Sequence, residues 1–114
     1  MTPTARTLEM CRRNGWYADV VERWIPGANI RRDLFGCIDI VAMSDQSMIG
    51  IQATSAANVS SRVSKIKNKC TEPALMWLLH AELQVWGWRK YPRRDSSGRS
   101  WRPRIEHITA EMLD

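Results

Sequence analysis

The fold of this chain is decided by residues 31–54, which read RRDLFGCIDIVAMSDQSMIGIQAT. Two apolar runs, residues 38–43 and 48–54, stand on either side of four polar residues, SDQS at 44–47. Short apolar runs with a polar spacer of this length are typical of adjacent antiparallel strands. We therefore predict a hairpin here, at the centre of a sheet.

Helical and extended patterns flank this hairpin on both sides. Before it, residues 4–14 have the periodicity of a helix, and residues 17–25 are rich in the aromatic and β-branched side chains that favour a strand. After it, helical spacing returns near residue 56, and residues 71–81 are apolar nearly all round, which predicts a short buried helix. Two last strands are predicted at 82–89 and 101–108. The sequence thus predicts one α/β domain over residues 1–114, a mixed β-sheet flanked by helices in the order α-β-β-β-α-α-β-β.

The composition favours a folded protein with an anionic partner. The chain is 44% hydrophobic, which argues against disorder, and 17 lysines and arginines against 12 acids give a net charge of +5. Nucleic acid is the partner that such a charge favours most. No apolar stretch approaches the ~20 residues of a membrane helix, the first residues lack a signal-peptide core, and the three cysteines are scattered. We expect no membrane partner and a cytoplasmic location in a bacterial or phage-infected cell.

One ionisable residue stands inside the first apolar run. Asp39 needs a partner, a metal or a solvent-lined cleft to justify a position within a strand. On the next strand Gln52 and Thr54 share one face, because strand side chains alternate with period two. Three polar side chains are therefore expected to converge.

This pattern resembles the PD-(D/E)xK nuclease superfamily, which has a restriction-endonuclease-like or Holliday-junction-resolvase-like fold. That superfamily carries an acid on one strand and an acid-x-lysine on the next, followed by a helix. The blocks RRDLFGCIDIVA, IQATSAANVSSRVSKI and VWGWRK also look like those of small phage or bacterial proteins. The resemblance implies that Asp39 and Gln52 hold a magnesium or manganese ion and that Thr54 takes the place of the lysine.

The departures from the superfamily pattern bear on catalysis. Gln52 still offers a carbonyl oxygen but no negative charge, which weakens metal binding. Thr54 cannot replace a cation that stabilises charge on phosphate.

Other residues can supply what the strand lacks. A cation is available from Lys65, which we favour, or from Arg62, one turn apart on the predicted helix. A further acid is available from Glu9, which by resemblance matches the helix glutamate of resolvase-like members, or from Glu22 or Asp33. The sequence leaves these alternatives open.

A purely structural interpretation stands beside the catalytic one. In it, Asp39 pairs with Arg31 or Arg32, while Gln52 and Thr54 satisfy a buried polar network.

The end of the chain is basic and aromatic. Arginines and lysines crowd the final predicted hairpin, with Trp86, Trp88, Tyr91 and Trp101 among them. The rings either stack on bases or pack as a structural cluster, and we favour packing for the tryptophans. The residues predicted to contact nucleic acid are Arg31, Arg62, Arg89, Lys90, Arg93, Arg94, Arg99 and Arg102.

The sequence therefore predicts a nucleic-acid-binding protein of nuclease fold, with DNA favoured over RNA, that hydrolyses phosphodiester bonds with magnesium or manganese. One alternative is a binding module that keeps the fold without catalysis. Another is a phage factor that inhibits a host enzyme through protein contacts. A homodimer is a further expectation, because many nucleases of this fold cut two strands as dimers.

Overall fold

The predicted hairpin is present in the computed structural model, which describes residues 1–92 and 98–114. Strand β4 (Ile40–Met43) pairs antiparallel with β5 (Met48–Ser55), so that Ile40 lies opposite Ile51. The Ser44 hydroxyl closes the turn by accepting hydrogen bonds from the backbone N–H groups of residues 46 and 47, each at 3.1 Å. The polar spacer thus forms the turn, as its composition predicted.

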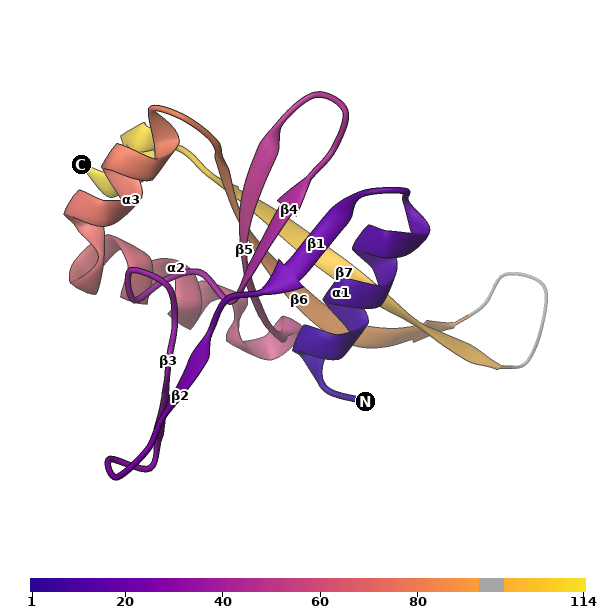
Figure 1. Cartoon of the computed structure of the whole chain (residues 1–114). Helices are drawn as coiled ribbons and strands as arrows, with labels where there is room; N and C mark the ends of the chain where they lie inside the picture. Colours follow the sequence, from indigo (N-terminus) through magenta and orange to yellow (C-terminus); the bar gives the residue numbers. More distant parts are fainter. Residues whose placement is uncertain (93–97) are drawn as a thin grey trace.

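A five-stranded mixed sheet is built outward from this hairpin in the order β1-β4-β5-β6-β7 (Figure 1). Its other strands are β1 (Tyr17–Val20), β6 (Glu82–Pro92) and β7 (Arg99–Ile108). Strands β5 and β6 are parallel, and the other neighbours are antiparallel. A parallel pair needs a long crossover, which a short 3-10 helix (Ala56–Asn58), α2 (Val59–Lys69) and α3 (Thr71–Leu78) provide here.

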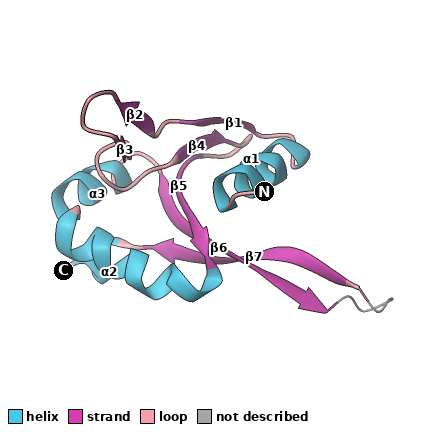
Figure 2. Ribbon diagram, turned by 90° about the horizontal axis from the view of Figure 1, so that it is seen from below, coloured by secondary structure: helices cyan, strands magenta, loops and turns pink. Residues whose placement is uncertain are grey.

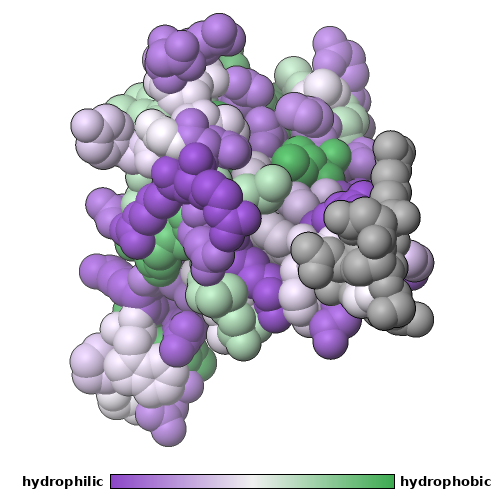
Figure 3. Space-filling view, turned by 90° about the vertical axis from the view of Figure 1, so that its right-hand side faces the viewer, coloured by the Kyte–Doolittle hydropathy of each residue, from purple (hydrophilic) through white to green (hydrophobic). Residues whose placement is uncertain are grey.

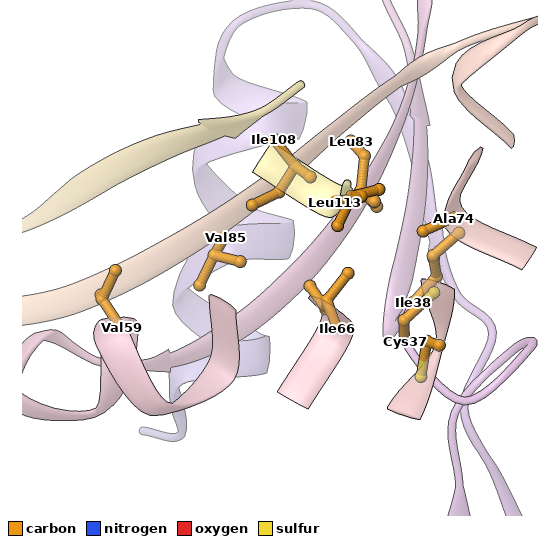
Figure 4. Packing of buried hydrophobic residues seen from close by; sticks show 10 residues of the cluster. Cys37, Ile38, Val59, Ile66, Ala74, Leu83, Val85, Ile108 and Leu113 are labelled. Atoms are coloured by element: carbon orange, nitrogen blue, oxygen red, sulfur yellow. The ribbon is translucent and has the colours of Figure 1, made fainter. Parts of the chain in front are cut away.

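Helices cover the two faces of the sheet separately (Figure 2). Helix α1 (Pro3–Arg13) packs on one face, over a buried cluster that includes Ile40, Ile51, Trp86 and Trp88. On the other face α2, α3 and the final 3-10 helix (Ala110–Leu113) enclose the second cluster (Figure 4). The members of this second cluster are Cys37, Ile38, Val59, Ile66, Cys70, Ala74, Leu83, Val85, Ile108 and Leu113. Burial on both faces explains why β5 reads as a nearly continuous apolar run.

Gly87 allows the crossover to lie directly on the sheet. A Cβ atom at this position would lie 2.2 Å from Val59 Cγ2 and 2.9 Å from the Cα atom of Ala56. The missing side chain therefore lets the start of α2 pack against β6, and this contact sets the path of α2 across the face that carries Gln52 and Thr54.

Three details differ from the sequence-based expectation. Residues 17–25 form two strands rather than one, because β2 (Arg23–Ile25) leaves the sheet and pairs with β3 (Ile30–Arg32) in a separate two-stranded ribbon. The predicted order, with five strands, was therefore two short of the seven in the described residues, because it merged β1 with β2 and did not include β3. Helix α3 was predicted to be buried, which is wrong: of its residues only Ala74 is buried, while Met76 is 67% exposed.

Among the described residues, none of the helices combines the length and the apolarity that crossing a bilayer requires. Cys11, Cys37 and Cys70 are buried free thiols.

Candidate metal centre

Three carboxylates meet where the ribbon joins the sheet. Glu22 directly precedes β2, Asp33 directly follows β3, and Asp39 directly precedes β4. One carboxylate oxygen of each lies within 4.8 Å of the others. Hard oxygen ligands of this kind are those that magnesium, manganese and calcium prefer.

The turn between Asp33 and Asp39 brings the two acids side by side. Leu34 and Ile38 form an antiparallel bridge, with N···O distances of 2.9 and 3.1 Å, so the residues that flank the bridge become neighbours. The turn closes through Gly36 at φ +80°, a backbone conformation that glycine adopts without strain. The RRDLFGCID stretch thus folds into a local loop that ends on the acid cluster.

Asp39 is held rigidly at the centre of the cluster. Its backbone N–H donates to the Ile51 carbonyl at 2.9 Å, its carbonyl accepts from the Val21 N–H at 2.8 Å, and its Oδ2 atom accepts from the Ala53 N–H at 2.9 Å. The residue is 6% exposed. The two backbone bonds therefore fix the position of the residue, and the Ala53 N–H in β5 fixes the direction of its carboxylate.

The environment of Asp39 favours its protonated form. Burial, the hydrogen bond to the Asp33 carboxylate and the charges of Asp33 and Glu22 raise the pKa of Asp39 to about 8, against the lowering effect of the Ala53 N–H. Like charges at this spacing repel each other, and a cation placed between them would remove the repulsion.

Gln52 lies beside the acid cluster and contacts it through its side-chain amide. The side chain is fully buried, and its Nε2 atom donates to Asp33 Oδ2 at 3.0 Å. Its Oε1 atom is buried without a hydrogen-bond partner among the described residues. A buried carbonyl oxygen without a partner is costly, and a hard divalent cation is one ligand that such an oxygen can bind.

Two cations lie at the rim of the cluster. The Lys65 ammonium of α2 is 3.5 Å from Asp33 Oδ2, and its side chain is 39% exposed. Arg31 binds Glu22 through a 3.2 Å ion pair. No ion pair within the described part of the chain joins Asp39 to Arg31 or Arg32, the pairing that the structural interpretation expected.

The structure brings together most, but not all, of the predicted catalytic side chains. Asp39, Gln52 and Lys65 meet around Asp33, while Thr54 is buried further along β5, opposite Gly87. Arg62 is partly exposed on α2.

Glu9 is not part of this set. It lies on α1, which packs on the opposite face of the sheet, and it forms an ion pair with Arg13 at 2.5 Å. Of the three acids that could have supplemented Asp39, the structure therefore brings Glu22 and Asp33 to it and leaves Glu9 elsewhere. The sequence signal for Glu22 and Asp33 was the PGAN turn between RWI and IRR. This turn closes a hairpin, and the two acids lie at the two ends of that hairpin.

The outer parts of β6 and β7, residues 89–92 and 99–102, form a basic arm that extends beyond the other strands of the sheet. In β6 and β7, Arg89 lies opposite Arg102 and Lys90 opposite Trp101. The guanidinium carbons of both arginines lie over the Tyr91 ring, at 4.9 and 5.9 Å from its centroid. Viewed along the arm, the surface is largely hydrophilic (Figure 3). Three of the predicted contacts, Arg93, Arg94 and the side chain of Arg99, lie outside the described part.

Of the tryptophans in β6 and β7, two lie in the core and one lies at the surface. Trp86 and Trp88 are buried, with ring centroids 6.3 Å apart, so the predicted packing is confirmed for these two but not for Trp101, which was expected in the same cluster. Trp101 is 41% exposed, and the Arg6 guanidinium carbon lies 3.8 Å from its ring centroid. Arginine and aromatic surface are therefore combined at the base of the arm.

No protein-family model, curated protein or solved structure matches this chain. The geometry of the acid cluster and the basic arm carries the functional argument.

Proposed function

We propose that this chain is a divalent-metal-dependent deoxyribonuclease with the restriction-endonuclease-like fold of the PD-(D/E)xK superfamily. The observation that carries this proposal is the meeting of the three carboxylates with the Gln52 side-chain amide and the Lys65 ammonium, both of which contact Asp33. The hairpin β4–β5, followed by α2, agrees with the chain order that the superfamily uses for its acids and helix.

The metal ligands would come from two parts of the fold. Asp39 and Gln52 belong to the central hairpin, and Asp33, with Glu22 behind it, belongs to the ribbon. The three acids restore the negative charge that Gln52 does not supply. A bound magnesium or manganese ion would act as a Lewis acid on a phosphate oxygen and would lower the pKa of a water molecule.

Lys65 would supply the positive charge that the superfamily lysine provides and that Thr54 lacks. Its ammonium group lies at the edge of the cluster and is partly exposed, where it can meet a phosphate. In this position it stabilises the negative charge that builds on the phosphate oxygens during hydrolysis. Asp33 is its positioning partner, since the same Oδ2 atom contacts Lys65 and Gln52.

The basic arm supplies affinity for the backbone of the nucleic acid. Arg89, Lys90 and Arg102 project from β6 and β7 with a side-chain spacing set by the strand register. Arginines that neutralise phosphates release counterions, which yields binding without sequence preference. Trp101 and Tyr91 add ring surface for stacking on unpaired bases.

The test is cleavage of labelled single-stranded, duplex and branched DNA with magnesium or manganese. The natural protein is compared with Asp39→Ala and with Asp45→Ala, a control that removes an exposed acid from the β4–β5 turn. The proposal predicts cleavage by the natural protein and the control and none by Asp39→Ala. Binding that depends on salt, with no cleavage by any of the three proteins, would refute the nuclease and support a binding module.

A further inference from the structure

The β2–β3 ribbon stands away from the body of the molecule (Figure 1). Its six paired residues bury almost nothing: Trp24 and Ile30 are each 53% exposed, and Ile25 alone is partly covered. A two-stranded ribbon without a packed face is marginally stable in water. Its exposed apolar groups are therefore more easily explained by a ligand than by the fold.

Charge is distributed unevenly along the ribbon. Arg23 lies directly opposite Arg32, and Arg31 lies on the other face of the ribbon, opposite Trp24. The part of the ribbon nearest the sheet, which we call the stem (residues 23–24 and 31–32), is therefore basic. The six residues from Ile25 to Ile30, IPGANI, carry no charge. Like charges directly opposite each other destabilise a strand pair, and an anion bound between them would relieve this repulsion.

The position of the ribbon relates it to the acid cluster. Its first strand begins after Glu22 and its second strand ends before Asp33, two of the three clustered acids. A nucleic acid bound along the stem would consequently lie next to the cluster. A ligand held by the ribbon would also fix the start of β2 and the end of β3, where these two acids lie.

We propose that the β2–β3 ribbon is a duplex-binding element, which sets its uncharged tip in a groove of double-stranded DNA and contacts the flanking phosphates through Arg23 and Arg32. A two-stranded ribbon fits a DNA groove, and apolar side chains such as proline and isoleucine can enter between base steps. Pro26 and Ile30 have this character at the tip. The inference deepens the proposed nuclease by naming duplex DNA as the substrate held at its site, and the binding itself requires no metal.

The charge pattern favours DNA over a protein partner. Apart from Glu22, which is engaged by Arg31, the segment from residue 22 to residue 32 contains no acid. A protein surface offers mixed charges, whereas a DNA groove offers two phosphate rows with bases between them. The basic stem would contact the phosphate rows, and the uncharged tip would lie between them at the bases.

The experiment measures binding of a labelled duplex in EDTA over a series of salt concentrations. The natural protein is compared with the double variant Arg23→Ala/Arg32→Ala and with Lys67→Ala/Lys69→Ala, which removes the same charge from exposed positions of α2. Losing two phosphate contacts is expected to lower the slope of log K against log salt by about 2, and affinity by roughly 10- to 100-fold at 0.1 M salt. The α2 control is expected to keep the natural slope.

A second variant separates charge from folding. Arg23→Lys/Arg32→Lys preserves both positive charges, so it is expected to retain the natural slope. Equal slopes for the natural protein and the Arg23→Ala/Arg32→Ala variant would overturn the inference, even if the protein cleaves DNA. Loss of slope at the ribbon, with no cleavage by the natural protein, would uphold the ribbon and refute the nuclease.

Discussion

Replacing Asp39 by asparagine is expected to stabilise the metal-free protein while abolishing cleavage. The pKa of Asp39 rises from 3.8 to about 8 on folding, mainly through burial, the Asp33 hydrogen bond and the charges of Asp33 and Glu22. Between these two pH values the folded chain holds the proton more tightly than the unfolded chain does, so its stability falls as the pH rises. At about 1.4 kcal/mol per pH unit, the loss of stability above pH 8 is on the order of 6 kcal/mol.

Asparagine keeps the shape of the side chain and can still accept the Ala53 N–H bond, but it carries no charge. The free energy of unfolding of Asp39→Asn and of the natural protein, measured with urea in EDTA, should therefore be similar near pH 4. The advantage of the variant should grow up to about pH 8 and then level off. Saturating manganese should reduce this advantage, because the ion stabilises the natural protein alone.

A difference in stability that does not change between pH 4 and pH 8 would contradict this prediction. It would mean that Asp39 is ionised in the folded protein at little cost, and that the surrounding carboxylates do not act on it. The exposed acid Asp45 provides the matched control, since Asp45→Asn removes one carboxylate from the β4–β5 turn without touching the acid cluster.

Three further predictions concern the cation, the packing and the arm. Lys65→Ala should lower the cleavage rate by roughly 100- to 1,000-fold, whereas Lys69→Ala on the same helix should cleave normally, as single-turnover kinetics would test. Gly87→Ala should reduce the free energy of unfolding by about 2–3 kcal/mol, measured with urea, because its Cβ atom would overlap the start of α2. Arg89→Ala/Arg102→Ala should lower the salt slope of single-stranded DNA binding by about 1.4, and an unchanged slope in anisotropy titrations would exclude the arm from the binding surface.

The parts of the fold that the sequence predicted are those set by local patterns. The polar spacer at 44–47 indicated the β4–β5 hairpin, and period-two alternation placed Trp86 and Trp88 on one buried face. The ribbon was missed because its boundary depends on a distant contact: Val21 and the residue after it donate to the Asp39 carbonyl, 18 positions later in the chain. No local pattern at residues 17–25 reports that hydrogen bond.

For the candidate site too, some residues could be predicted from local patterns, whereas others depend on distant contacts. Asp39 and Gln52 were predicted together, because neighbouring strands align them, and the structure also brings Lys65 to this set. Choosing Glu22 and Asp33 over Glu9 required the path of the ribbon and the side of the sheet on which α1 packs. The exposure of α3 likewise depends on what lies beside it, which an apolar sequence does not specify.

The central claim is that Asp33, Asp39 and Gln52 share one divalent cation, and crystals soaked in manganese chloride test it most directly. One anomalous scattering peak is expected between these side chains, at about 2.0–2.3 Å from their oxygen atoms, with Gln52 Oε1 among the ligands. The same soak of Asp39→Asn crystals should show no peak there. A peak elsewhere, or none at the cluster in the natural protein, would mean that these side chains do not form a metal site.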